Sequence, residues 1–230
     1  MKAFHIFEEK INIRFNNPDL LEQAFVHRSY LNENKEVRRE HNERLEFLGD
    51  AVLELVITHF LYEKFPHKPE GELTALRSAL VNAVALAQVA QKLEVNEYLL
   101  LSKGEAKDTG RARSYILADA LEAIIGAIYL DQGYDAAKRF IYMHITTLLD
   151  EILAKELWID AKSKFQEIAQ EEVGITPSYK VVKETGPDHD KHFTVAVCLG
   201  PKEIAKGSGK SKQEAEQDAA REALKIEKWK

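Results

Sequence analysis

The chain has 230 residues, enough for one large domain or two smaller ones, and its hydrophobic share of 45% is ordinary for a globular protein. The single cysteine, Cys198, excludes an intrachain disulfide and a cysteine-ligated metal cluster. Charges occur too early in the N-terminal segment for a signal peptide, and no apolar run approaches membrane-spanning length. We therefore expect a cytoplasmic protein with no membrane partner.

The net charge of −6 is unevenly distributed along the chain. Residues 1–159 contain 19 Lys and Arg against 25 Asp and Glu, whereas residues 160–230 contain 13 of each kind. The whole negative excess therefore lies in the first part. An acidic chain is atypical of nucleic-acid binders, but carboxylates that hold metal cations would change the field that a substrate meets.

The first part is predicted to be helical throughout. Asn17 and Pro18 are suited to the N-cap and the first position of a helix. Apolar residues at helical spacing predict further helices, over residues 42–65, 72–92, 114–130 and 136–155.

The pattern changes near residue 159. A helix is predicted over residues 162–172, followed by three strands and a final helix that opens with a capping box at Ser211 and Glu214. The strands are predicted at residues 178–184, 192–199 and 202–206. The sequence thus predicts an all-α domain over residues 1–155, a linker at 156–160 and a small α+β domain, in the order α-β-β-β-α, over 161–228.

An acidic stripe follows one face of the predicted helix at residues 42–65. Glu43, Glu46 and Asp50 are spaced i, i+3 and i+7, and Glu54 extends the stripe by one turn. The other positions are mostly apolar, which predicts a buried helix. A solvated acidic face would carry basic partners at i+4, and none follows Phe47. Like charges at this spacing repel each other unless a cation relieves them.

A second acidic pair, Asp119 and Glu122, lies in an otherwise apolar segment and is followed on the same face by Gly126. Glycine there would let another backbone or a ligand approach closely. Two such helices would face each other across a polar pocket, which is either a metal site or a structural polar network. Oxygen ligands alone favour Mg²⁺, with Mn²⁺ as a substitute. The chain has no Glu-x-x-His motif of the di-iron type, and His41 is interpreted as a packing or capping residue.

Lys210 and Lys212 flank Ser211 at the start of the last predicted helix. Positive charge is unfavourable at a helix N-terminus, but a bound phosphate would make both lysines favourable. Surface lysines that only aid solubility are the alternative. A phosphate loop for nucleotides is excluded because Ile204 stands where that motif requires glycine, so no nucleotide cofactor is expected.

Several of these segments resemble one family. Residues 41–53 (HNERLEFLGDAVL) resemble the signature helix of bacterial-type ribonuclease III, and residues 117–123 (LADALEA) resemble its second acidic motif. The last part is similar to a double-stranded RNA-binding domain. Supporting matches are residues 27–30 (HRSY) and 70–73 (EGEL), and 103–105 (KGE) leading to Gly110 and Arg111.

The resemblance implies a magnesium-dependent endoribonuclease that cuts double-stranded RNA. It implies that Glu46, Asp50, Asp119 and Glu122 bind the metal. Catalysis would depend on Asp50 and Glu122, helped by two further acids, Glu43 and Glu70. Arg44 is interpreted as a partner of these acids, either buried or next to the metal ligands, rather than as a catalytic group.

The resemblance also implies a homodimer with one site per subunit. The products would carry 5′-phosphate and 3′-hydroxyl ends with short 3′ overhangs, and processing of ribosomal and messenger RNA is the expected role.

By the same resemblance, Gln166 and Glu167 would face one RNA minor groove and His189 the next. Lys210, Ser211 and Lys212 would lie at the phosphates between them. His189 could equally be an ordinary loop residue. Two rival functions remain: an inactive relative that only binds duplex RNA, and an unrelated metal-binding helical protein with an RNA-binding domain attached.

Overall fold

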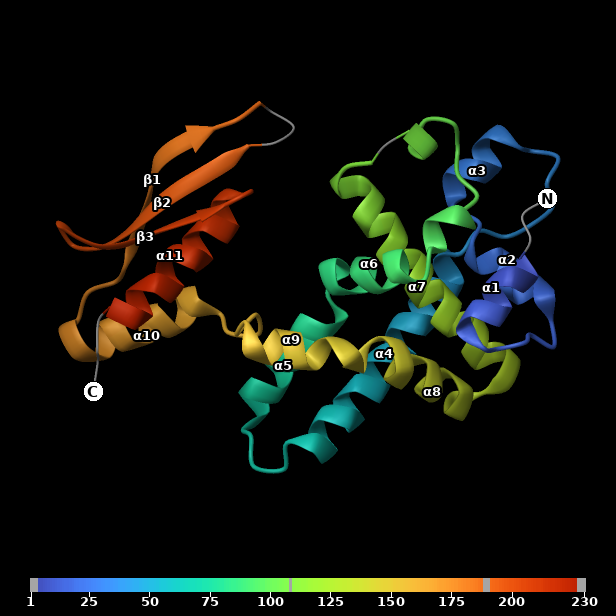
Figure 1. Cartoon of the computed structure of the whole chain (residues 1–230), viewed down its shortest axis with the longest axis horizontal. Helices are drawn as coiled ribbons and strands as arrows, with labels where there is room; N and C mark the ends of the chain where they lie inside the picture. Colours follow the sequence, from blue (N-terminus) through green and yellow to red (C-terminus); the bar gives the residue numbers. More distant parts are fainter. Residues whose placement is uncertain (1–3, 108, 188–190, 227–230) are drawn as a thin grey trace. The chain divides into compact units, whose positions relative to one another are not determined.

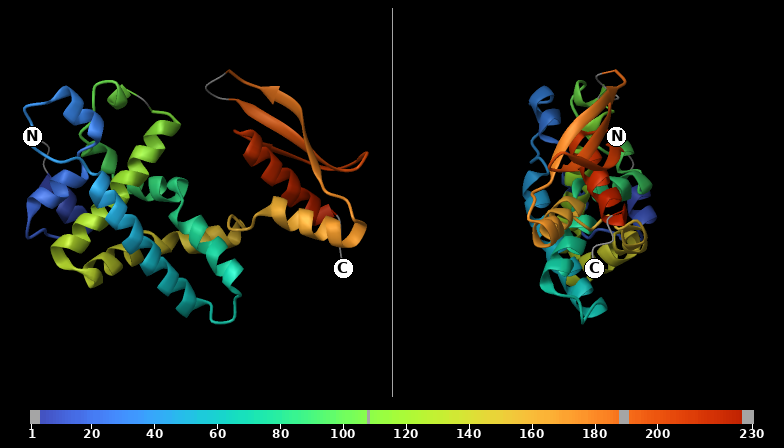
Figure 2. Two further views of the ribbon diagram at one scale, coloured as in Figure 1. Left: turned by 180° about the vertical axis from the view of Figure 1, so that it is seen from behind. Right: turned by 90° about the vertical axis from the view of Figure 1, so that its left-hand side faces the viewer.

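The computed structural model describes residues 4–107, 109–187 and 191–226. The chain divides into two compact units, Met1–Trp158 and Ile159–Lys230 (Figures 1 and 2). This division falls within the segment that the sequence predicts as a linker.

The first unit is helical. Its helices, among the described residues, are α1 (Phe4–Ile11), α2 (Pro18–Ala24), α3 (Arg28–Glu33), α4 (Glu43–Lys64), α5 (Glu70–Val81), α6 (Ala83–Lys92), α7 (Arg111–Gln132), α8 (Tyr134–His144) and α9 (Leu149–Ala154), with 3-10 turns at Val95–Glu97, Glu105–Lys107 and Thr146–Leu148. The apolar residues of α4, α6 and α7 supply much of its core. The helix predicted from Asn17 and Pro18 is confirmed as α2. Its predicted N-cap is confirmed as well, since the Asn17 side chain accepts a hydrogen bond from the backbone N–H of Asp19.

The helix predicted over residues 72–92 is wrong as a single element. It is two helices, α5 and α6, bent by 43° at Asn82. Asn82 has an extended backbone, and its side chain accepts from the N–H of Ala85, which caps α6. Among the described residues no single helix is long and apolar enough to span a membrane, although the bent pair α5–α6 passes that test of length and composition when taken together.

The helix predicted over residues 136–155 is also interrupted. It ends as α8 at His144, and a 3-10 turn separates it from α9. The hydroxyl groups of Thr146 and Thr147 donate to the backbone carbonyls of Tyr142 and His144. Such side-chain bonds to the backbone compete with a regular helix, which accounts for the interruption.

The second unit has the predicted order of elements. These are α10 (Ala161–Val173), β1 (Ser178–Thr185), β2 (His192–Leu199), β3 (Lys202–Gly209) and α11 (Lys212–Ile226). The strands form an antiparallel sheet in the order β1-β2-β3. Phe165 of α10, Val197 of β2 and Ala219 of α11 lie in its core.

Strand β3 is longer than the sequence predicts. The prediction ends it at residue 206, before a glycine-rich turn, whereas β3 continues to Gly209. A Cβ added to Gly207 would lie 2.0 Å from the backbone nitrogen of Ala219 on α11. The glycine therefore serves close packing of the strand against α11 rather than a turn.

The chain is anchored on both sides of the junction between the units. Trp158 packs against the core of the first unit, and the Lys68 Nζ lies 5.0 Å from the centre of one of its rings. Asp160 caps α10 by accepting from the Ser163 N–H, and Gln217 Nε2 donates to Asp160 Oδ1 at 2.8 Å. Only Ile159 separates these two anchored residues.

Candidate metal centre and RNA-binding surface

Helices α4 and α7 cross at two glycines. A Cβ added to Gly49 would lie 1.8 Å from the carbonyl oxygen of Glu122, and one added to Gly126 would lie 2.2 Å from that of Leu45. The two backbones are therefore in direct contact, and no larger residue fits at either position. The close approach predicted at Gly126 is made by another helix, and it places the acidic faces of α4 and α7 side by side.

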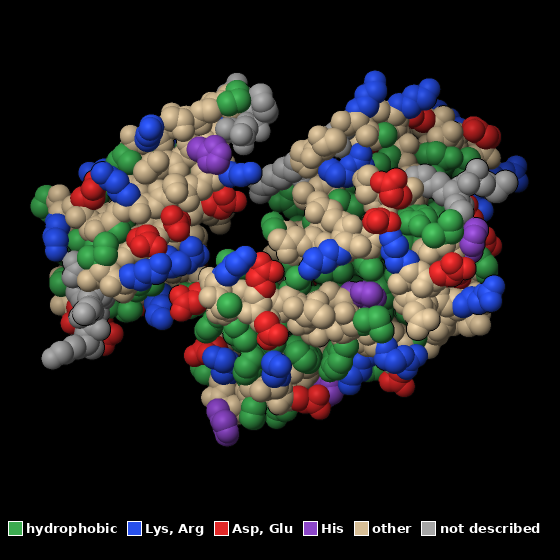
Figure 3. Space-filling view, in the orientation of Figure 1, with side chains coloured by type: hydrophobic (Ala, Val, Ile, Leu, Met, Phe, Trp, Pro, Cys, Tyr) green, Lys and Arg blue, Asp and Glu red, His purple; other side chains and the backbone are tan. Residues whose placement is uncertain are grey.

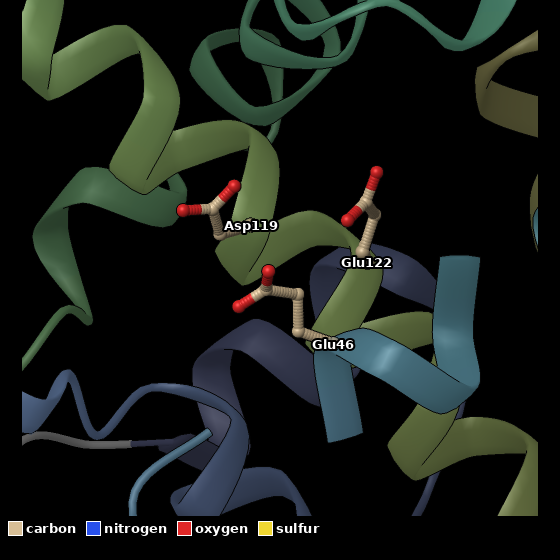
Figure 4. Close-up of side chains that lie close together, drawn as sticks. All are labelled: Glu46, Asp119 and Glu122. Atoms are coloured by element: carbon tan, nitrogen blue, oxygen red, sulfur yellow. The ribbon is translucent and has the colours of Figure 1, made fainter. Parts of the chain in front are cut away.

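Three carboxylates meet beside this crossing (Figure 4). Glu46 projects from α4, and Asp119 and Glu122 come from successive turns of α7. One carboxylate oxygen from each lies within 4.8 Å of the others, and all three residues are partly buried. This arrangement can hold a metal ion.

The electrostatics of the cluster also favour a cation. Burial, followed by the charges of Asp50 and Asp119, raises the pKa of Glu122 to about 8. Burial and the charges of Asp119 and Glu43 raise the pKa of Glu46 to about 7. The pKa of Asp119 is raised by burial. Ionised carboxylates are unfavourable here without a positive charge, and three oxygen ligands fit a hard divalent cation.

The other three predicted acids lie outside this group. Asp50 is exposed, one turn beyond Glu46, and its charge reaches both Glu46 and Glu122. Glu43 pairs with Arg28, with 3.3 Å between Oε1 and Nη1. Glu70 is exposed at the start of α5 and accepts from the Thr74 hydroxyl.

One expectation about the neighbours of the stripe is wrong. Arg44 is not buried: its side chain is 83% exposed and pairs with Glu40. The end of the stripe also has a basic partner, which lies outside α4: Arg77 Nε is 3.0 Å from Glu54 Oε2. Arg77 comes from α5, so helical spacing within α4 contains no signal for it. His41 lies 3.8 Å from Glu43, measured from Nδ1 to Oε2, and not among the three clustered acids.

The predicted RNA contacts of the second unit are spread over its surface. Lys210 and Lys212 are exposed at the start of α11, and Ser211 Oγ accepts from the Glu214 N–H. Glu214 Oε2 accepts from the Lys210 N–H, so the capping box forms in a slightly shifted version. The lysine ammonium groups and the hydroxyl hydrogen of Ser211 can still meet a phosphate.

Gln166 and Glu167 are exposed on α10, as a contact surface requires. His189 lies outside the described residues. On the face of the molecule shown in Figure 3, basic and acidic side chains are both scattered over the surface. Recognition of RNA by this unit would therefore depend on a few placed cations.

Two families match the two units. Residues 17–149 match the family described as Ribonuclease-III-like, and residues 161–227 match the double-stranded RNA binding motif.

Similar proteins share both units. The chain is 49% identical to ribonuclease 3 of Protochlamydia amoebophila over 94% of its own length and 89% of that protein. It is 47% identical to ribonuclease 3 of Geobacillus kaustophilus, covering 96% and 89% of the two chains. The solved nuclease domain of ribonuclease III from Campylobacter jejuni is 39% identical, with a TM-score of 0.58 over 63% of this chain and 97% of that one.

A helical unit with clustered carboxylates, joined to a unit that binds double-stranded RNA, defines a metal-dependent endoribonuclease of two domains. The chain belongs to the ribonuclease III family. It is therefore a hydrolase, and its second unit binds double-stranded RNA.

Proposed function

We propose that the chain hydrolyses phosphodiester bonds of double-stranded RNA with Mg²⁺ held by Glu46, Asp119 and Glu122, and that Mn²⁺ can replace it. The convergence of these three carboxylates within 4.8 Å is the observation that carries the proposal. All the ligands are oxygens, which suits Mg²⁺ and Mn²⁺. Asp50, one turn from Glu46, is proposed as a further ligand.

The bound ion would supply Lewis acidity, which neutralises phosphate oxygens and lowers the pKa of a water. The protein's part is to hold the carboxylates in place on two helices whose backbones are locked at Gly49 and Gly126. We propose in-line attack by water, which requires no side-chain nucleophile and leaves 5′-phosphate and 3′-hydroxyl ends with short 3′ overhangs. Glu43 and Glu70 would assist from outside the cluster.

The test is cleavage of a long perfect RNA duplex by the full chain, with Mg²⁺ or with EDTA. Glu122→Gln should reduce the cleavage rate about a hundredfold or more, since loss of even an outer partner of a metal ligand costs about 10–100-fold. The dissociation constant for duplex should stay within about twofold. Glu151→Gln, an exposed glutamate of α9 paired with Lys155, is the matched control. Intact RNA in every reaction with wild type, but with binding retained, would favour the inactive RNA-binding relative instead.

We also propose a homodimer, supported by an apolar stripe on α4. Phe47 and Leu55 are 81% and 58% exposed, and Ala51 lies between them on the same face. Exposed apolar stripes of this kind typically mark protein interfaces. The C. jejuni nuclease-domain structure is described as having a region involved in dimer formation.

Sedimentation equilibrium tests the dimer. Wild type should sediment as two chains and Leu55→Lys as one, whereas Val84→Lys, at an exposed apolar residue of α6, should not change the mass. A wild-type mass of one chain at micromolar concentration would contradict the proposed dimer.

The cellular role is proposed on broader grounds. Recognition by the second unit would read the shape of A-form RNA and its 2′-hydroxyls more than its sequence, which suits processing of ribosomal and messenger RNA precursors. The only cysteine, Cys198, is a free thiol, which is compatible with the proposed cytoplasmic location. Sequencing of RNA ends in cells with and without the Glu122→Gln variant would identify the targets.

A further inference from the structure

Arg77 of α5 is bonded to two turns of α4 at the end of the acidic stripe. Its Nε lies 3.0 Å from Glu54 Oε2, and its Nη1 donates to Thr58 Oγ1 at 3.0 Å. Thr58 Oγ1 donates in turn to the backbone carbonyl of Glu54 at 2.6 Å. A planar guanidinium held at two points is more firmly oriented than an ordinary surface lysine. Arg77 and Glu54 are also each about two-thirds buried, so solvent screens this pair less than a fully exposed one.

Without Arg77, the row of unpaired carboxylates on α4 would continue past the metal centre to Glu54. Glu46, Asp50 and Glu54 follow one another at intervals of four residues, so each lies one turn from the next. The charge of Glu54 reaches the centre, because it is among the charges that raise the pKa of Glu122. A free Glu54 carboxylate would therefore offer divalent cations a second position, between itself and Asp50.

We propose that Arg77 is a positioning residue that confines the divalent cation to the Glu46–Asp119–Glu122 end of the stripe by engaging Glu54. The inference rests on the proposed metal centre and adds a determinant of where the cation binds. Arg77 contributes no ligand. Its guanidinium pairs with the Glu54 carboxylate, which would otherwise compete with the three clustered carboxylates for the same ion.

The experiment counts bound Mn²⁺ on the full chain without RNA, by electron paramagnetic resonance of the free ion. Arg77→Met should bind one additional Mn²⁺ ion per chain, because the Glu54 carboxylate is no longer paired. Tighter binding without an additional ion would reflect only the removal of a nearby positive charge and would overturn the inference. The double variant Arg77→Met/Glu54→Gln should return to the wild-type curve. Arg39→Met is the matched control: Arg39 is 37% exposed against 34% for Arg77 and pairs with Glu22, away from the stripe.

Cleavage provides the second measurement. In Arg77→Met the rate at limiting Mn²⁺ should fall several-fold, because part of the metal occupies the wrong position, and excess Mn²⁺ should restore it. A loss of rate that excess metal does not restore, with an unchanged Mn²⁺ count, would mean that Arg77 only supports the fold and would overturn the inference.

A further variant keeps the test decisive if Arg77→Met folds poorly. Glu54→Gln alone should leave the number of bound Mn²⁺ ions unchanged and weaken their binding by no more than about tenfold, the through-space effect of removing one nearby negative charge, whereas loss of a bound ion would identify Glu54 as a ligand and refute the inference. Failure of the metal centre itself has a different signature. In that case wild type and Glu122→Gln would bind the same number of Mn²⁺ ions, and this would hold with either arginine or methionine at position 77.

Discussion

The two units place their functional groups in opposite ways. In the first unit the acids Glu46, Asp119 and Glu122 are partly buried at a crossing of two helix backbones, so their geometry depends on packing. In the second unit Lys210 and Lys212 are exposed at the start of one helix, so their contribution depends on charge. The comparison implies that cleavage should be sensitive to small changes of shape, and RNA binding to salt.

The largest expected effect comes from filling the helix crossing. Gly49→Ala should destabilise the first unit by at least about 3 kcal/mol and abolish cleavage, because the new methyl group would overlap the Glu122 carbonyl oxygen. Urea unfolding followed by circular dichroism measures the loss. Gly71→Ala is the control, since no atom lies within 4 Å of its added Cβ, and it should be neutral or up to about 1 kcal/mol more stable. Equal stability of the two variants would contradict the packing described for α4 and α7.

The next effect is a dependence of metal-free stability on pH. In the folded state the pKa values of Glu46 and Glu122 are raised to about 7 and 8. Both groups therefore bind a proton more tightly in the folded state than in the unfolded state, and this contribution to stability is fully present below the ordinary carboxyl pKa. That contribution is lost as the pH rises through about 7 to 8. In EDTA, the free energy of unfolding should fall by on the order of 1–2 kcal/mol between pH 6 and pH 9, after allowance for solvent screening.

Glu122→Gln isolates this pH effect, because other titrating groups are common to both proteins. In the variant the free energy of unfolding should fall much less between pH 6 and pH 9, so that the variant is more stable than wild type at pH 9. Parallel pH profiles for the two proteins would show that the cluster is better solvated than its burial indicates.

The smallest effect concerns the exposed lysines. Lys210→Ala/Lys212→Ala should weaken duplex binding about tenfold at 0.15 M salt and reduce the slope of log affinity against log salt by about one for each phosphate that the protein no longer neutralises. Lys225→Ala, near the end of α11 and paired with Glu222, is the control. Fluorescence anisotropy over a range of salt measures both quantities. An unchanged slope would place the phosphates elsewhere on the second unit.

Local patterns in the sequence are enough to predict the acidic stripe, the facing pair on α7 and the close approach at Gly126. They do not contain contacts between distant segments, which is why the partnership of Arg77 with Glu54 is not predictable from them. The error about Arg44 has another cause. Apolar residues surround α4 on nearly every side, and periodicity cannot show that the side carrying Phe47 and Leu55 is uncovered in a single chain. The break at Asn82 escapes prediction because apolar residues continue at helical spacing on both sides of it, and this periodicity outweighs one residue that favours caps.

The anchored junction between the units has a kinetic consequence. Because Trp158 and Asp160 are each held within their own unit, Ile159 is the one connecting residue without such an anchor. When a short flexible tether joins two binding units, the second encounter with the same duplex is intramolecular, with an effective concentration on the order of millimolar. We therefore expect that, once the RNA-binding unit has captured a duplex, the nuclease unit of the same chain meets RNA at such a local concentration, however scarce the RNA is in solution.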